Sequence, residues 1–329
     1  MLSPDRLSVL VPTFQGERFL SEALGSVCKY STNDTEVIVI DDGSTDSTLQ
    51  VARAYENRMR LRILRPHPQG NWLAMTNVGL SEATGSWCCI LHQDDRWHPD
   101  RLTSGLPTLL STHSLSMICL QTELMDERGK RVGCWRFPSS VRQYVSEPVR
   151  APLASSLYVQ NWLSVPSVIF DTVLARHCGG LDESLWYTAD WDMWLKLLSN
   201  APAILVESTG ASFRIHSQSQ TALRSLDSRA FRMQLEVVQR RHQWAISDQP
   251  RARSYRRAGD LSTRTNAALA AAFHLRPSGY WSWAGSLALA GFRGVIIYFT
   301  NSSILDRILP RLRLLARRSL RSSSSSSLA

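Results

Sequence analysis

The chain has 329 residues, a hydrophobic fraction of 43% and a net charge of +9. The length suits one large domain, or a domain of about 220 residues with an appendage. Six cysteines without C-x-x-C spacing argue against a disulfide framework, and we expect reduced core residues of a cytosolic protein. The positive charge is concentrated in residues 214–329, which contain 19 Arg, no Lys and 5 acidic residues, whereas residues 1–213 are net acidic.

The first hundred residues alternate apolar runs with segments of helical spacing. Strands are predicted at 7–14, 36–40, 61–66 and 87–91, and helices at 18–30, 47–58 and 70–85. Strands that alternate with helices form parallel sheets with right-handed crossovers. Their continuous apolar character agrees with burial on both faces. We therefore expect an α/β fold with a doubly wound, mostly parallel sheet flanked by helices.

The pattern changes along the rest of the chain. A strand is predicted near 116–126, a helix within 185–200 and a strand that begins at 203. Beyond residue 225 the pattern becomes helical and Arg-rich, and the run of serines near the end predicts a disordered tail. The longest apolar region, Gly279 to Thr300, is interrupted by Arg293 and lacks the roughly 20 clean apolar residues of a membrane-spanning helix.

Polar side chains follow three of the predicted strands. Thr13 ends the first strand, Asp41 and Asp42 end the second, and the pair Asp94 and Asp95 follows the fourth. In open α/β sheets, ligands bind outside the carboxyl ends of the strands. Adjacent carboxylates repel each other unless a positive charge lies beside them. This convergence predicts a single site that handles an anion or a metal ion.

Six segments then carry a resemblance, in the same order, to family 2 glycosyltransferases. They are "SVLVPTFQGERFLSEALGSV", "EVIVIDDGSTDST", "GNWLAMTNVGL", "LHQDDRWHPDRL", "GGLDESLWYTADWDMWLKL" and "FRIHSQSQT". The resemblance spans residues 8–221 and implies a GT-A fold. It also implies inverting transfer of a sugar from a nucleotide diphosphate sugar, with Mg²⁺ or Mn²⁺ as the cofactor. A nicotinamide-dependent Rossmann enzyme is set aside because "VPTFQGERF" lacks G-x-G-x-x-G.

The resemblance assigns a nucleotide site to the ends of the first two strands. Asp41 or Asp42 would accept from the base, and Pro12, Thr13 and Phe14 would line the same pocket. The alternative for the acids is an acid-rich turn, which is common after strands.

Two further residues are assigned to the donor. Asn77 would face the site, with helix packing as its alternative. Arg214, in the family's R-x-H element, could pair with phosphate oxygens.

The metal ion is assigned to Asp94, with Asp95 second and His216 within reach of the metal or the diphosphate. Hard divalent cations take carboxylate and phosphate oxygens, and they stabilise a diphosphate leaving group as Lewis acids. The family pattern here is usually D-x-D-D, and His92 replaces its first acid. The alternatives are a solvated turn for the acids and a structural role for His216.

The general base is assigned to Asp190, with Asp192 as the second candidate. An inverting transfer needs a base that takes the proton of the acceptor hydroxyl as it attacks. Ala189 occupies the place of the first acid in the family's E-D pair, and Trp191 is either a sugar-stacking residue or part of the core. The alternative for Asp190 is a helix N-terminal charge that the helix dipole favours.

We expect a catalytic domain at 1–224, an Arg-rich helical extension at 225–320 and a disordered tail at 321–329. The predicted activity is transfer from a UDP-sugar to a glycan or lipid-linked acceptor. A non-catalytic glycan- or nucleotide-sugar-binding homologue is the alternative. The extension has the composition of an interfacial membrane helix, which predicts a cytoplasmic protein at the inner face of the cell membrane, or of a packed helical layer. No nucleic-acid-binding motif accompanies the charge.

Overall fold

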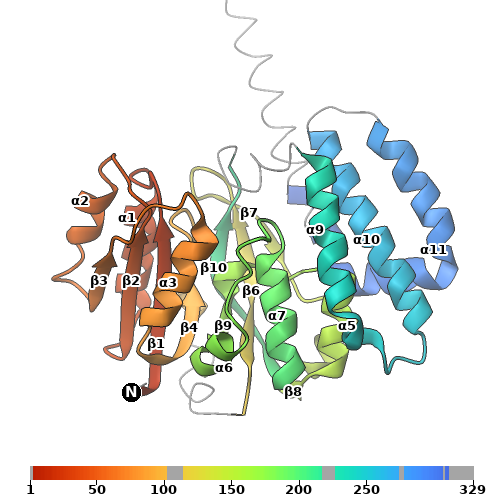
Figure 1. The fold of residues 1–329 in the computed structure, drawn as a ribbon, viewed down its shortest axis with the longest axis horizontal. Coiled ribbons are helices and arrows are strands. Elements are labelled where there is room, and N and C mark those ends of the chain that lie inside the picture. The colour runs from red at the N-terminus through yellow and green to blue at the C-terminus, as the bar shows by residue number, and fades with distance from the viewer. Residues whose placement is uncertain (1–2, 102–113, 217–226, 274–277, 307, 311–329) are drawn as a thin grey trace, which may run out of the picture.

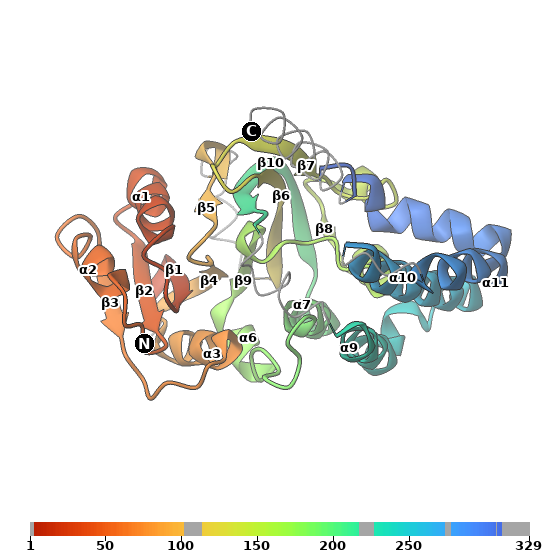
Figure 2. The same ribbon diagram turned by 90° about the horizontal axis from the view of Figure 1, so that it is seen from above.

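The computed structural model describes residues 3–101, 114–216, 227–273, 278–306 and 308–310. A ten-stranded sheet forms its centre, and its main path has the strand order β3-β2-β1-β4-β9-β6-β10-β5 (Figures 1 and 2). The strands of that path are β1 (Ser3–Thr13), β2 (Thr35–Asp41), β3 (Leu61–Leu64), β4 (Gly85–Ile90), β5 (Arg96–Trp97), β6 (Met117–Met125), β9 (Val168–Asp171) and β10 (Ala203–Arg214). Two short strands lie beside this path: β7 (Arg131–Trp135) pairs with β6, and β8 (Pro148–Val149) pairs with β10.

The sheet is mostly parallel, as predicted, with an antiparallel strand at its centre. β3, β2, β1 and β4 are parallel neighbours, and β10 is parallel to β6. β9 lies antiparallel to both β4 and β6, so β6 has the same direction as β4. The carboxyl ends of β1, β2, β4, β6 and β10 therefore meet along one edge of the sheet.

The two faces of the sheet are covered by different helices. One core packs the inner face of α1 (Leu20–Tyr30) and α2 (Thr48–Arg53) against Val9 and Val37. The other packs against Leu10 and Ile38 on the opposite face. The helices of this second face are α3 (Trp72–Glu82), α5 (Ala151–Val159), α6 (Thr172–His177) and α7 (Ala189–Asn200). Side chains alternate across each strand, and both sets are apolar because both faces are buried.

Three further helices form a layer at one end of the sheet (Figure 1). They are α9 (Ser228–Arg241), α10 (Ala252–Phe273) and α11 (Ser278–Ser302). Ala258 and Leu261 of α10 and Ile297 and Tyr298 of α11 share a small core with Val159 of α5. The extension thus contains a packed helical layer with its own apolar interior. The Ser-rich tail predicted to be disordered lies outside the described residues.

Within the described ranges, no individual helix combines the length and apolar character needed to cross a bilayer. A pair of segments bent by 52°, Leu287–Ser302 and Ile304–Pro310, passes that test jointly, by length and composition alone.

Candidate active site

The candidate site begins where β1 and β4 end, and Gln93 joins the two strand ends. The backbone N–H of Phe14 donates to Gln93 Oε1 at 2.9 Å, and Gln93 Nε2 donates to the Phe14 carbonyl at 3.0 Å. This double contact extends the sheet-like pairing beyond the last residues of both strands. The Phe14 ring stays 52% exposed at the rim, whereas Pro12 and Thr13 are buried, and the Thr13 hydroxyl donates to the Ile40 carbonyl.

Asp41 and Asp42 lie at the same rim and are both buried. Asp41 accepts from the Ser44 N–H at 3.2 Å and from Arg65 Nε at 3.3 Å. Asp42 accepts from the backbone N–H groups of Gln69 and Asn71, at 2.7 and 3.1 Å.

The two carboxylates thus shape the loops that surround the expected nucleotide pocket. The observed contacts of both carboxylates are those expected of an acid-rich turn. A contact with the base of the nucleotide stays a prediction. It would have to share these carboxylates with the loop residues.

Asp94 and His216 bring the ends of β4 and β10 together. His216 Nε2 lies 2.7 Å from Asp94 Oδ2, and the Phe19 ring packs at 5.3 Å from the imidazole. The sequence placed these two residues 122 positions apart. Their contact supports the assignment of both to one centre.

Asp95 and His92 complete the group. His92, Asp94 and Asp95 offer ligand atoms that all lie within 4.8 Å of one another. The Asp95 carboxylate accepts from the Arg214 backbone N–H at 2.8 Å, and its Oδ2 lies 3.8 Å from His92 Nδ1. The edge of the His92 ring packs against Trp72 at 4.8 Å.

Three polar atoms of this group are buried and have no hydrogen-bond partner among the described residues. They are His92 Nε2, Asp95 Oδ2 and His216 Nδ1. Buried polar atoms normally find partners, and a bound ion or water is one ordinary explanation for such atoms. Two carboxylates and imidazole nitrogens are donors that Mn²⁺ and related ions accept. The residues therefore fit a divalent cation, which His92, Asp94 and Asp95 would hold with His216 beside them.

The surroundings set the charges of the group. Burial lowers the pKa of His92 and keeps its imidazole neutral, against the opposing charge of Asp94. Burial alone would raise the pKa of Asp94, but the His216 hydrogen bond and the charges of His92 and His216 hold it below its ordinary value. Burial and the Asp94 charge raise the pKa of Asp95 well above its ordinary value. A neutral His92 and an ionised Asp94 are the forms that bind a cation.

Arg214 occupies a different place from the one predicted. Its side chain is buried, and its three guanidinium nitrogens contact the carbonyls of Asp94 and Glu127 and the Glu22 carboxylate, at 2.7, 3.1 and 2.5 Å. The guanidinium also stacks over the Phe19 ring. These contacts make Arg214 a support for the Asp94–Asp95 turn. A phosphate contact would require the guanidinium to leave protein partners that already satisfy it.

Asp190 lies at the beginning of α7. That helix ends at Asn200, three residues before β10 begins at Ala203, so it runs antiparallel to β10. Its first turn therefore lies toward the same edge of the sheet as Asp94. The Asp190 carboxylate is half-buried and accepts from Asn161 Nδ2 at 2.8 Å. A half-buried carboxylate at this edge agrees with the general-base prediction.

Asp192, the second candidate base, has a structural environment instead. It is fully buried and accepts from Lys196 Nζ at 2.7 Å and His242 Nε2 at 2.9 Å, with an Arg241 nitrogen at 3.5 Å. Burial would raise its pKa, but the His242 and Lys196 contacts together lower it. An acid that is buried and ion-paired in this way cannot reach an acceptor hydroxyl. The geometry speaks against Asp192 as a base and makes it an anchor between α7 and α9.

The contacts of Trp191 and Asn77 agree with the packing alternatives, and the donor contact of Asn77 stays a prediction. Trp191 is buried in the core, and its indole N–H donates to the Leu157 carbonyl at 2.7 Å. Asn77 accepts from the Leu181 N–H and donates to the Leu181 carbonyl and Glu183 Oε1. Both side chains therefore hold the protein together in this structure, and Asn77 fixes the loop before α7.

Sequence reasoning missed Gln93, Asn161 and Trp72 as site residues. Gln93 lies inside the quoted motif, but no periodicity marks an amide that binds a backbone 79 positions away. Asn161 lies in an unremarkable segment after α5, and only its contact with Asp190 indicates a role. These contacts depend on tertiary geometry.

Comparisons with known proteins agree with this geometry. A family model described as "Glycosyl transferase family 2" matches residues 8–143. An uncharacterized glycosyltransferase of Rickettsia prowazekii (strain Madrid E) is 26% identical over 225 residues, which is 67% of this chain and 68% of that protein.

Two solved structures have a similar fold. The S. aureus TarS 1–349 complex with UDP-GlcNAc has a TM-score of 0.63 at 20% identity, covering 87% of this chain and 80% of that one. The mannosyltransferase PcManGT from Pyrobaculum calidifontis, in complex with GDP-Man and Mn²⁺, has a TM-score of 0.54 at 15% identity, covering 90% and 89%. Residues 8–143 are thus similar to the family 2 glycosyltransferases, and the chain has the GT-A fold of these solved structures.

Proposed function

We propose that this glycosyltransferase moves a sugar from a UDP-sugar to a hydroxyl acceptor, with inversion at the anomeric carbon. The observation that carries the proposal is the His92, Asp94 and Asp95 group at the carboxyl end of β4, whose ligand atoms lie within 4.8 Å of one another. Asp190 begins α7 toward the same edge. The arrangement offers a cation site for the leaving diphosphate and a separate carboxylate for the acceptor.

Each group has a role that its surroundings support. A bound divalent cation would supply charge stabilisation for the departing diphosphate. Glu22 and Arg214 hold the turn that carries Asp94 and Asp95 in place. Asp190 takes the acceptor proton as the hydroxyl attacks, and its hydrogen bond from Asn161 orients the carboxylate.

The donor assignment rests on the rim and on the neighbours. The exposed Phe14 ring offers a face on which a base can stack, beside the buried carboxylates of Asp41 and Asp42. One neighbour holds UDP-GlcNAc and the other holds GDP-Man with Mn²⁺. We favour uridine because the more similar fold is the UDP-GlcNAc complex.

The acceptor is proposed to be a surface glycan or a lipid-linked sugar. TarS is a poly(ribitol-phosphate) β-N-acetylglucosaminyltransferase of Staphylococcus aureus, so one protein with a similar fold acts on a phosphate-containing polymer. In this chain, an exposed apolar stripe on α11 supports attachment to an anionic membrane. The stripe consists of Leu289, Phe292, Ile296 and Phe299. Sedimentation with anionic vesicles should weaken in Phe292→Ser, and unchanged sedimentation would count against this attachment.

The test of the activity is release of UDP from a panel of UDP-sugars with Mn²⁺, with and without an acceptor. Asp190→Asn should lower the rate by about 10²- to 10⁴-fold. GDP-mannose serves as the competing donor. Preference for GDP-mannose would overturn the uridine assignment, and full activity of Asp190→Asn would overturn the base.

The alternative is a homologue that binds a nucleotide sugar without turnover. His92 and Ala189, which replace acids of the family pattern, favour it, and Ala189 is buried in the core where no second acid could act. A protein that binds UDP tightly, yet releases none from any UDP-sugar with any acceptor, would support this alternative.

A further inference from the structure

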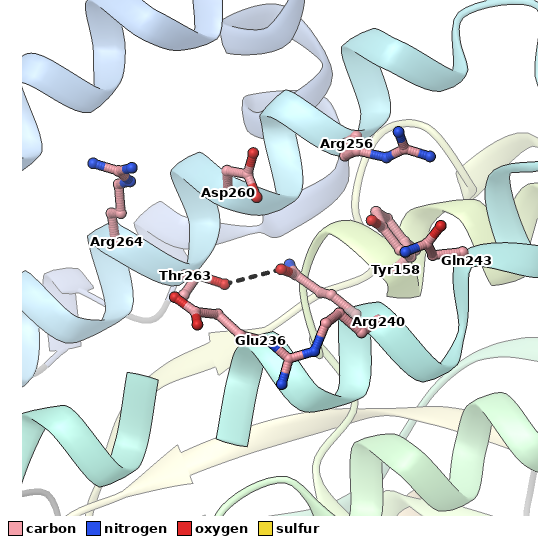
Figure 3. Close-up of a pocket in the computed structure, with 9 residues that line it drawn as sticks. Tyr158, Glu236, Arg240, Gln243, Arg256, Asp260, Thr263 and Arg264 are labelled. Atoms are coloured by element: carbon pink, nitrogen blue, oxygen red, sulfur yellow. Dashed lines mark hydrogen bonds between the residues drawn. The ribbon is translucent and has the colours of Figure 1, made fainter. Parts of the chain in front are cut away.

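A polar cavity of about 310 Å³ lies in the helical layer, between α9, α10 and the end of α5 (Figure 3). Its walls include Tyr158 of α5, Arg240 of α9 and Arg256 and Arg264 of α10. The volume falls within the range of small-molecule sites, at its lower end. None of the residues assigned to sugar transfer lines this cavity.

The cavity presents three guanidinium groups: Arg256 contacts the Tyr158 hydroxyl, and Asp260 interacts electrostatically with Arg256 and Arg264. Among the described residues, Arg240, Arg256 and Arg264 form no ion pair within 4.0 Å. The Glu236 carboxylate, which also lines the cavity, is instead paired with Arg232 at 2.8 Å. A guanidinium presents a planar fork of donors that matches phosphate oxygens, so three of them around one cavity favour an anionic ligand.

Gln239 gives a second and independent indication of a ligand. The residue is 7% exposed and lines the cavity, and its Oε1 accepts from the Thr263 hydroxyl at 3.2 Å. Its Nε2 is buried and has no hydrogen-bond partner within the described ranges. Leaving a buried donor unpaired carries the full cost of removing it from water. An acceptor atom that enters the cavity would remove this cost.

The acidic residues in the wall narrow the ligand class. Glu236 and Asp260 lie among the arginines (Figure 3). They would repel a bare phosphate, but carboxylates accept hydrogen bonds from sugar hydroxyls. The mixture of three arginines, two acids and two amides therefore suits a phosphate that is attached to a polyhydroxylated group.

The cavity also lies close to the proposed base. Tyr158 precedes Asn161 by three residues, a span of at most about 10 Å, and Asn161 donates to Asp190. Between them, Gln160 accepts from Ser262 of α10 at 2.6 Å, so the end of α5 is fixed to the cavity wall. A ligand in the cavity would thus lie one short segment away from Asp190.

From these observations we propose that the cavity binds a phosphate-bearing sugar or polyol, as the recognition site for an anionic acceptor. The acceptor role rests on the proposed function, whereas the binding itself does not. The shared chemistry, phosphate joined to a polyol, occurs both in soluble sugar phosphates and in lipid headgroups.

The test measures binding of glucose 1-phosphate to the full chain by calorimetry, with the donor site saturated by UDP and Mn²⁺. Glucose and inorganic phosphate are the matched ligands, and both should bind more weakly. Arg256→Gln and Arg264→Gln should each weaken binding about tenfold or more. Arg253→Gln, which removes the same charge from α10 outside the cavity, should leave binding unchanged. A second arm repeats the comparison of the variants with phosphatidylglycerol vesicles. Binding that depends on Arg256 with the vesicles, but not with glucose 1-phosphate, would identify a lipid headgroup as the ligand.

Several results would overturn the proposal. These are no binding in either arm, an equal loss in Arg253→Gln, or loss of binding when UDP fills the donor site. The proposed function fails separately: binding that depends on Arg256 and Arg264, in a protein that turns over no UDP-sugar, would keep this site and reject the transferase activity.

Discussion

Replacing Asp192 by Asn separates structural from catalytic acids on α7. Asp192 is fully buried and accepts from Lys196 at 2.7 Å and His242 at 2.9 Å. Removing one partner of a buried ion pair costs about 3–5 kcal/mol, because the other charges stay behind without compensation. Asn keeps the shape and one acceptor oxygen, so we expect about 3 kcal/mol, the lower end of that range. For a chain of this size, that corresponds to a fall in Tm of roughly 6 °C.

The assay compares thermal unfolding with the initial rate of UDP release, measured well below both transitions. Asp192→Asn should lower Tm and keep most of the activity per folded molecule. The matched variant is Asp190→Asn, two residues earlier on the same helix. It should lose about 10²- to 10⁴-fold in rate with little change in Tm, because Asp190 is half-buried and an amide can still contact Asn161.

The reasoning would be refuted by the reverse pattern. If Asp192→Asn abolished turnover at an unchanged Tm, while Asp190→Asn stayed active, the base would be Asp192 and the buried ion cluster would have to open during catalysis.

Three further predictions follow from the site and its supports. Replacing His92 by Asp restores the acid of the family pattern, and hard oxygen donors favour Mg²⁺. Titration of metal binding should therefore show a smaller preference for Mn²⁺ over Mg²⁺ than in the parent protein. An unchanged ratio of the two affinities would exclude His92 as a ligand. Gly16→Ala would place Cβ 2.4 Å from Gln93 Oε1, and overpacking of this kind costs about 1–3 kcal/mol. In a Gln93→Ala background the same change should cost much less, and additive costs in a double-mutant cycle would contradict the contact. Burial would raise the pKa of Asp182, but hydrogen bonds from Ser184 and Arg241 hold it at about 2, below its ordinary 3.8. Its contribution to stability is therefore present above pH 3.8 and lost as the pH falls toward 2. Asp182→Asn should make the free energy of unfolding less dependent on pH in this acidic range. An unchanged pH dependence would mean that solvent screens the Asp182–Arg241 ion pair.

The parts of the fold that sequence predicted best are those governed by local patterns. The apolar runs near 7–14, 36–40 and 87–91 correspond to β1, β2 and β4. Strands that are buried on both faces are continuous apolar runs, which are easy to find in a sequence. The short antiparallel β9, Val168–Asp171, was not predicted, since four residues between helical segments carry little periodic signal.

Roles within the site depended on partners from distant segments. Asp190 and Asp192 look alike in sequence, but the burial of Asp192 and its contacts with Lys196 and with His242, which directly follows α9, make the second one structural. The sequence position of Arg214 suggested a phosphate ligand, whereas in the structure its guanidinium donates to the Glu22 carboxylate of α1. The sequence motifs identified the residues that gather at this edge of the sheet. The role of each residue depends on its contacts with helices and strands that are distant in sequence.

The contacts of α9 have a consequence for how this protein could be shortened or recombined. The Tyr187 backbone N–H donates to Gln234 Oε1 at 2.9 Å, Asp182 accepts from Arg241 at 2.6 Å, and Asp192 contacts His242. A version that stopped at residue 224 would remove all three contacts from α7 and the segment before it, and would leave the buried Asp192 carboxylate with Lys196 as its partner but without His242. The segment from α9 to His242 thus supports α7 and the segment before it, and an exchange of this region between relatives would succeed only if the three contacts were kept.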